Sequence, residues 1–260
     1  MAPGLPNAVI ALGEKFGRLV NYGDGLYGGQ YIGAMYAEAF FETDPARIVD
    51  AGLRCIPPGS QYAEAVRDVV RWHQENPGDW EKTWQLVNQK YQLNPDYRRI
   101  ICERARKRGN GYNIDAKLNG AYVVMGLLYG RRDLDQTIAI ATRCGQDSDC
   151  NPSSAAGIVA TTCGFSSLPA KYSRGLSETT VFSNTEYTFP KLLAACEKIA
   201  RQALDQSGGK VERITSGEEV WIIPAAIPRP SALEKSWAPG PIANSRFTED
   251  ERKRITVATQ

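Results

Sequence analysis

Two aspartates in a short polar run carry the chemistry that this sequence suggests most strongly. Asp147 and Asp149 stand two residues apart in the stretch 144–152, which reads Cys-Gly-Gln-Asp-Ser-Asp-Cys-Asn-Pro. The preceding helical pattern stops at Gly145 and the next begins near Asn151, so the positive end of a helix dipole lies beside the carboxylates and favours their ionised form. Two ionised carboxylates with no histidine nearby suit a hard cation such as Mg²⁺ or Ca²⁺.

Three interpretations of this acidic pair compete. The pair could do no more than cap the following helix, since Asp-x-Asp is common in loops. An EF-hand would match at its first, third and fifth positions, but its glycine falls on Pro152 and its bidentate glutamate on Ile158, which excludes it. The third interpretation is one half of a carboxylate metal centre whose other half lies elsewhere in the chain.

The elements that must hold this run in place are predicted to be helices. Helical patterns occur in eight segments, and Asp133 with Gln136 resembles a capping box at the start of one of them. The segments are 7–20, 31–41, 61–75, 80–91, 114–129, 134–144, 153–163 and 190–206. The glycine-rich stretch 21–29 is expected to be a loop with glycines in left-handed backbone conformations.

The order of elements predicts an all-α domain. The chain shows no internal repeat and no alternation of strands with helices, and residues 220–223 form its one convincing strand pattern. Five prolines follow between residues 224 and 241, which favours extended chain. We therefore predict a helical domain over residues 1–210 and a short Pro-rich, partly extended tail over residues 211–260 that leads out of the domain.

Composition excludes several classes of protein. Of the 260 residues, 42% are hydrophobic and 23% charged, and no apolar stretch is long enough for a transmembrane helix. The net charge of +2 gives no reason to expect nucleic acid as a partner. His73 is the only histidine, which argues against histidine catalysis and multi-histidine metal sites. The six cysteines include no CxxC pair, and free thiols are expected at Cys163 and Cys196.

Three segments together resemble the ADP-ribosylglycohydrolase family. The first is Gly145-Gln-Asp-Ser-Asp149, entered from an amphipathic helix and followed by a helix of small residues that ends in Cys-Gly-Phe165. The second is the apolar run 113–130 and the third is the glycine-rich stretch 21–29. The resemblance covers roughly residues 5–209. It implies a helical fold with a centre of two Mg²⁺ ions that cleaves ADP-ribosyl bonds.

The resemblance also implies roles for particular residues. Asp147 and Asp149 would be catalytic metal ligands, and Cys150 stands where the family has a further, threonine ligand. The metal would position the ribose hydroxyls and activate a water for attack at the anomeric carbon. Contacts to the substrate would come from the two loops at the residues Gly23, Asp24, Gly25, Gly145, Gln146 and Ser148. For Asp24, a role in forming the turn is an equal alternative.

Two departures from the family pattern shape the expected function. A neutral thiol at Cys150 is a poor ligand for Mg²⁺, so either the second metal would bind more weakly or an oxygen of the backbone or of Asn151 would substitute. The second acidic cluster, a Thr-Asp-Asp-type run, is not found in the sequence, which suggests an N-terminally incomplete member.

We predict a Mg²⁺-dependent hydrolase of ADP-ribosyl N- or O-glycosidic bonds. The alternatives are a non-catalytic relative that binds ADP-ribose and a hydrolase of other N-glycosides.

The expected partners follow from the same resemblance. The substrate would be an ADP-ribosylated protein or a small ADP-ribosyl conjugate, with neither nucleic acid nor a membrane involved. The sequence leaves the acceptor side of the scissile bond, the oligomeric state and the compartment open. A basic run over residues 98–108 is either a solvated surface or a surface that attracts a phosphate-bearing substrate.

Overall fold

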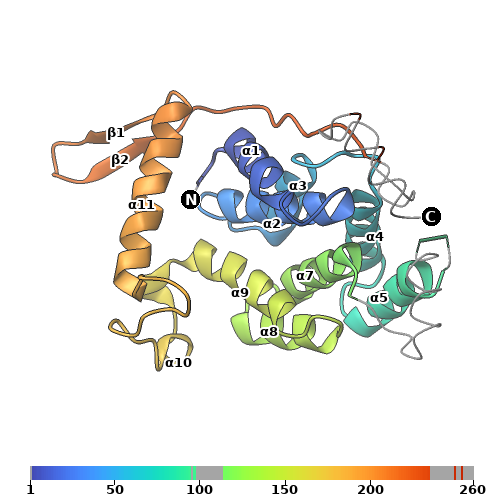
Figure 1. The fold of residues 1–260 in the computed structure, drawn as a ribbon. Coiled ribbons are helices and arrows are strands. Elements are labelled where there is room, and N and C mark those ends of the chain that lie inside the picture. Colours follow the sequence, from blue (N-terminus) through green and yellow to red (C-terminus); the bar gives the residue numbers. More distant parts are fainter. Residues whose placement is uncertain (1, 95, 98–113, 235–248, 250–252, 254–260) are drawn as a thin grey trace.

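The computed structural model describes residues 2–94, 96–97, 114–234, 249 and 253, and this part of the chain is mostly helical (Figure 1). The prediction of an all-α domain is thereby confirmed. The main helices are α1 (Pro6–Gly17), α2 (Asp24–Glu38), α3 (Pro45–Leu53), α4 (Gln61–Glu75), α5 (Trp80–Val87), α7 (Ala116–Gly130), α8 (Leu134–Arg143), α9 (Cys150–Cys163) and α11 (Phe189–Gln206). The short elements are the π-helix η1 (Asn88–Gln92), the 3₁₀ turn η2 (Phe165–Ser167) and α10 (Ala170–Ser173).

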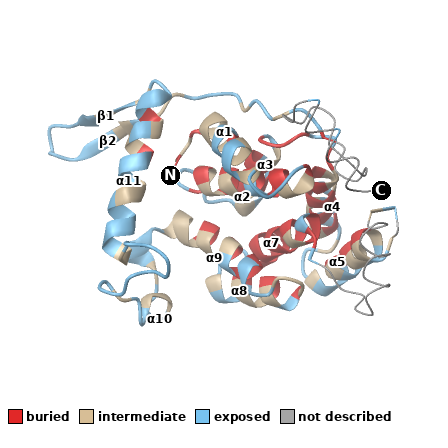
Figure 2. Cartoon of the chain, viewed as in Figure 1, coloured by how far each residue is buried: buried red, intermediate tan, exposed pale blue. Residues whose placement is uncertain are grey.

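Helix α7 lies at the centre of the main hydrophobic core. All but two of its 15 residues are buried, as expected for a helix that is apolar all round and has neighbours on every side. Helices α2, α4, α8 and α9 pack against it, and the buried residues concentrate on α2, α4 and α7 (Figure 2). This central helix therefore relates the two segments that carry the predicted site, because most of the glycine-rich stretch lies in α2 and the acidic run leads into α9.

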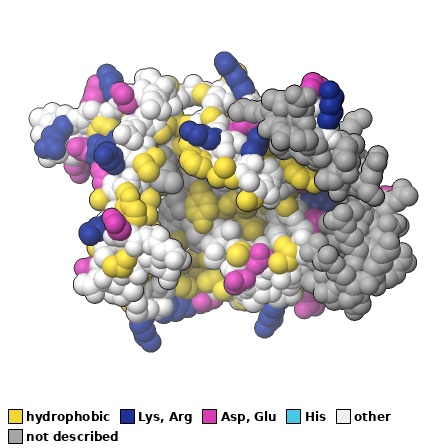
Figure 3. Space-filling view, in the orientation of Figure 1, with side chains coloured by type: hydrophobic (Ala, Val, Ile, Leu, Met, Phe, Trp, Pro, Cys, Tyr) yellow, Lys and Arg dark blue, Asp and Glu magenta, His cyan; other side chains and the backbone are white. Residues whose placement is uncertain are grey.

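A smaller core joins the first residues of the chain to the end of α11. Ala2, Leu5 and Leu204 are buried together, with Trp221 of a β-hairpin against them. The hairpin pairs β1 (Lys210–Arg213) antiparallel with β2 (Glu219–Ile222), so the predicted strand has a partner that the sequence pattern did not indicate. Between the α11 arm and the other helices this face is hollowed, and hydrophobic side chains gather there (Figure 3).

The glycine-rich stretch is mostly helix, which corrects the prediction of a loop. Residues from Asp24 onward form the first turns of α2, and of the four glycines in this stretch only Gly23 has a positive φ, at 53°. Gly28 is needed for close packing, because a Cβ there would come within 3.0 Å of the Tyr62 ring. Burial between helices thus outweighs the low helix propensity of glycine in this stretch.

Residues 223–234, which we call the strap, lie back along the helical body. In this described part of the tail, Asn7 on α1 bonds the backbone of Ile227 and Arg229. Farther on, Glu234 is buried beside Gly23. These are long-range polar contacts, which the composition of a proline-rich tail does not indicate. The expectation that residues 211–260 lead out of the domain stays a prediction, as does the domain boundary at residue 210.

Other expectations have simpler outcomes. Among the described residues, no helix has both the length and the apolar character needed to span a bilayer. The basic run 98–108 lies outside the described residues. The five described cysteines are free thiols, with Cys163 and Cys196 half-buried.

Candidate metal centre

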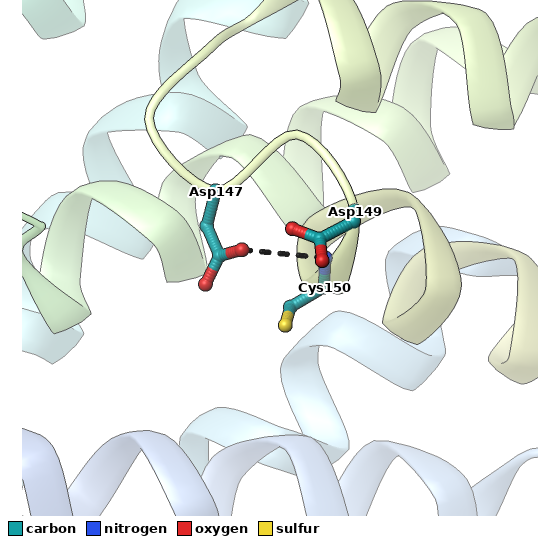
Figure 4. A group of neighbouring side chains, drawn as sticks. All are labelled: Asp147, Asp149 and Cys150. Carbon is teal, nitrogen blue, oxygen red and sulfur yellow. Dashed lines mark hydrogen bonds between the residues drawn. The ribbon is translucent and has the colours of Figure 1, made fainter.

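The loop between α8 and α9 brings Asp147, Asp149 and Cys150 together (Figure 4). One ligand atom from each lies within 4.8 Å of the other two, and this is the sole such trio of acidic, thiol or imidazole groups in the described part of the chain. Asp147 is half-buried, whereas Asp149 and Cys150 are exposed. The donor atoms are therefore accessible from solvent while the loop that carries them is anchored below.

Capping of α9 accounts for part of this arrangement. Asp149 is the residue before the helix, yet its side chain makes no capping hydrogen bond. The Cys150 N–H donates to Asp147 Oδ1 at 3.4 Å, a long contact. Hydrogen bonding with the Asp147 carboxyl group, and then with nearby backbone N–H groups, holds the pKa of Asp149 below its usual value. Asp149 is exposed, so its ionised carboxylate is accessible to a cation from solvent.

Gln146 holds the loop by both ends of its side-chain amide. Its Oε1 accepts a hydrogen bond from the Asp115 backbone N–H at 3.2 Å, and its Nε2 donates to Gln92 Oε1 at 2.7 Å. Its φ of 59° is unusual for a residue with a side chain and follows Gly145, which is also left-handed at 87°. The predicted role of Gln146 as a substrate contact stays a prediction, but the structure shows its amide engaged within the protein.

Two further side chains fix the ends of the loop. Trp84 of α5 donates its indole N–H to the carbonyl of Cys144 at 2.8 Å. Asn151 is buried and donates to Asn119 Oδ1 on α7 at 3.0 Å, with a longer contact to the carbonyl of Gly145. The Asn151 side chain is thus buried and held through its Nδ2, and its role as a substitute oxygen ligand stays a prediction.

The start of α2 reaches the same region through a buried charged pair. Lys117 donates to the Asp115 carboxylate at 2.8 Å, and both side chains are almost fully buried. Burial raises the pKa of Asp24, while the nearby Lys117 charge opposes this rise. Because Asp115 also donates to Gln146, the pair lies between Asp24 and the acidic loop. The charges of Asp115 and Lys117 at the start of an otherwise apolar helix are visible in the sequence, but the prediction of site residues did not include them.

Asp24 has a structural contact that the sequence could not show. Its Oδ1 accepts from the Tyr62 backbone N–H at 3.2 Å, at the start of α4. Asp24 thus ties the first turn of α2 to the first turn of α4. Gly23 is buried and Gly25 half-buried, so the backbone of this segment offers only part of its surface to a ligand. The substrate contacts predicted here stay predictions.

Ser148 and His73 occupy contrasting positions. Ser148 is exposed between the two aspartates, where a substrate could reach it. His73 was expected on the surface, but it is half-buried and stacks edge-on against Tyr129, with ring centroids 4.7 Å apart. Burial lowers the pKa of His73. Its contact is with the side of the core near α5, and no described contact joins it to the acidic loop.

The donor set fits a hard cation in part. Two carboxylates at this spacing are ligands that Mg²⁺ prefers, and their exposure leaves room for the waters that this ion retains. Hydrogen bonding to Asp147, together with the negative charge of both aspartates, raises the pKa of the Cys150 thiol. A protonated thiol contributes little to Mg²⁺. Asp147 and Asp149 therefore fit the ion, and Cys150 does not.

Comparison with known proteins identifies a family whose model covers this loop. The family model described as ADP-ribosylglycohydrolase matches residues 1–208, about four-fifths of the chain. The matched range contains the start of α2, the buried Asp115–Lys117 pair and the acidic loop. No curated protein and no solved structure matches the chain.

Proposed function

The chain belongs to the ADP-ribosylglycohydrolase family, and from that premise we propose that it is a Mg²⁺-dependent hydrolase of ADP-ribosyl N- or O-glycosidic bonds. Family membership supports a glycohydrolase acting on ADP-ribosyl linkages. The observation that supports the finer proposal is the convergence of the Asp147 and Asp149 carboxylates with the Cys150 thiol at a position open to solvent.

The residues of the acidic loop would divide the work as follows. Asp147 and Asp149 would hold the ion, and the lowered pKa of Asp149 keeps its carboxylate ionised. A bound Mg²⁺ would supply the positive charge that orients ribose hydroxyls and acidifies a water. Gln146 would keep the pair in place through Asp115 and Gln92. Since His73 lies elsewhere, a carboxylate is the general base available to this loop.

The test is turnover by the full chain. An ADP-ribosyl-arginine conjugate and an ADP-ribosylated protein would be incubated with Mg²⁺ and, separately, with a chelator, and release of ADP-ribose would be followed by chromatography. We expect release only with Mg²⁺, and a loss of at least about 100-fold in the Asp147→Asn and Asp149→Asn variants. The exposed Asp205→Asn change on α11 is the matched control. Release that survives the chelator would contradict the proposal.

A second candidate is a relative that binds ADP-ribose without cleaving it. Cys150 favours this candidate, because it withholds the oxygen ligand of the family pattern. So does the finding that, within the described ranges, no second group of three acidic, thiol or imidazole side chains converges as this one does. Saturable binding of ADP-ribose in calorimetry, with no turnover of either substrate, would support the binding function and exclude the hydrolase function.

A further inference from the structure

The strap (residues 223–234) is held by polar contacts more than by apolar burial. Ile223 packs against the smaller core at the start of the strap, but farther on Ile227 is 84% exposed and Leu233 is 42% exposed. A hollow of about 680 Å³ remains between the strap and α1, lined by residues of both. A segment that is packed this loosely needs specific hydrogen bonds to stay in one place.

Helix α1 holds the first half of the strap. The Asn7 side-chain amide donates to the carbonyl of Ile227 at 3.0 Å and accepts from the N–H of Arg229 at 2.9 Å. Ser231 Oγ then donates to Glu14 Oε2 at 3.2 Å. These contacts align the strap along α1 and direct its end toward the start of α2.

Glu234 ends the strap with a buried carboxylate at the start of α2. Its side chain is 3% exposed, and its Oε2 accepts from the Gly23 N–H at 3.0 Å. Its backbone N–H donates to Tyr27 Oη at 2.7 Å, one turn into the helix. Arg18, at the end of α1, pairs with its other carboxylate oxygen. One residue thus joins the end of α1, Gly23 and the first turn of α2.

The charges in this contact are matched. Burial alone would lower the pKa of Arg18, but hydrogen bonds and negative charge from Glu234 and Glu14 raise it above its usual value. The carboxylate of Glu234 also faces the positive end of the α2 dipole. Charge-assisted hydrogen bonds of this kind are short and directional, so they define the position of the groups that they join.

Gly23 is the residue on which this contact acts. Its φ of 53° and ψ of −129° are open to glycine and strained for other residues, so its conformation depends on outside contacts. We propose that Glu234 is a positioning residue: by fixing Gly23 and the first turn of α2 it presents the segment 23–25 to the substrate. The claim that the segment 23–25 contacts the substrate rests on the proposed function. Glu234 lies beyond the matched residues 1–208, so this support comes from outside the family range.

Hydrogen exchange tests the positioning directly, without substrate. In the full chain, the Glu234→Ala variant should exchange the amides of residues 22–27 at least about tenfold faster, while the amides of α7 stay unchanged. The Glu234→Gln variant keeps an oxygen that accepts from Gly23, so it should recover most of the protection. Glu186→Ala, at an exposed glutamate of a loop, is the control. If Glu234→Ala proves too unstable, Asn7→Ala loosens the strap and leaves the buried carboxylate in place.

Binding and kinetics test the consequence for the substrate. Glu234→Ala should weaken ADP-ribose binding, and raise KM, about tenfold with kcat unchanged, because the segment 23–25 is proposed to bind the substrate and holds none of the proposed metal ligands. Faster exchange with unchanged ADP-ribose affinity would overturn the substrate role, and unchanged exchange would overturn the positioning of Gly23. If the wild-type chain bound no ADP-ribose, the proposed function would fail, while exchange would still decide the positioning.

Discussion

The Asp115 backbone N–H donates to Gln146 Oε1 at 3.2 Å, so the acidic loop is tied to the residue that caps the central helix α7. Replacement of Gln146 by Ala removes this bond and the bond to Gln92. We expect a loss of about 1–2 kcal/mol in the free energy of unfolding. Turnover should fall about tenfold or more, because Asp147 is no longer held in place. Urea unfolding measures the loss of stability. Release of ADP-ribose across a Mg²⁺ titration measures the loss of turnover.

The Gln146→Gly variant separates the loss of the amide hydrogen bonds from the strain of the left-handed backbone. Glycine relieves the left-handed backbone and still lacks the amide, so it should be more stable than the alanine variant and no more active. Gln202→Ala, at an exposed position on α11, controls for loss of a glutamine in general. Equal activity of wild type and Gln146→Ala would mean that the loop does not need this anchor.

Replacement of Cys150 by Thr should strengthen Mg²⁺ binding. The change places a hydroxyl oxygen where the raised pKa keeps a protonated thiol. We expect about tenfold tighter binding, or about 1.4 kcal/mol, and weaker binding of thiophilic ions such as Cd²⁺. Calorimetric titration with each ion measures both. Cys163→Thr is the matched control, and an unchanged Mg²⁺ affinity in Cys150→Thr would exclude position 150 from the centre.

Replacement of Asp24 by Asn should change how stability depends on pH. Burial raises the pKa of Asp24 above its ordinary 3.8, so the folded chain binds this proton more tightly than the unfolded chain. The stability that Asp24 contributes is therefore complete below pH about 3.8 and is lost as the pH rises through the raised pKa. Asparagine does not titrate and can still accept from the Tyr62 N–H.

The measurement for Asp24 is chemical unfolding at a series of pH values. The stability of Asp24→Asn relative to wild type should increase from pH 3.5 toward neutrality. The exposed Asp205→Asn variant should show no such trend. A relative stability of Asp24→Asn that falls as the pH rises would show that the Lys117 charge outweighs burial at this carboxyl group.

Replacement of Gly120 by Ala should destabilise the core. A Cβ at Gly120 would lie 2.1 Å from Tyr62 Oη and 2.3 Å from Cζ of the same ring, in the middle of α7. We expect a loss of about 3 kcal/mol in the free energy of unfolding, at the upper end for overpacking. Gly29→Ala, on α2 with nothing within 4 Å, should instead gain about 0.5–1 kcal/mol. Equal melting temperatures for the two variants would contradict this packing.

Local signals predicted much of the fold. The helix over residues 61–75 was predicted with its observed bounds, because its apolar spacing is regular and Asn76-Pro-Gly ends it. The cap at Asp133 was also predicted, and Asp133 accepts from the Gln136 N–H at 2.8 Å. These features depend on residues within a turn of one another, so a single sequence contains them.

The rest depended on contacts between distant residues. Gly25 and Gly28 indicated a loop by propensity, but they lie in a helix because α2 and α4 approach closely. The Asn151 side chain is bonded to Asn119 on α7, a contact that the sequence around Asn151 did not indicate. Glu234 had no local signal, because its partners Arg18 and Gly23 are more than 200 residues away. Such placements follow from tertiary packing and not from local pattern.

The hydrogen bond from Trp84 to the carbonyl of Cys144 gives the acidic loop an intrinsic spectroscopic probe. Indole emission depends on what the N–H contacts, so a shift of the loop on ligand binding would change the fluorescence of this tryptophan. The difference between wild-type and Trp84→Phe spectra would isolate its signal from the other tryptophans. Occupancy of the candidate centre can thus be followed in real time, in unlabelled protein and before any substrate is known.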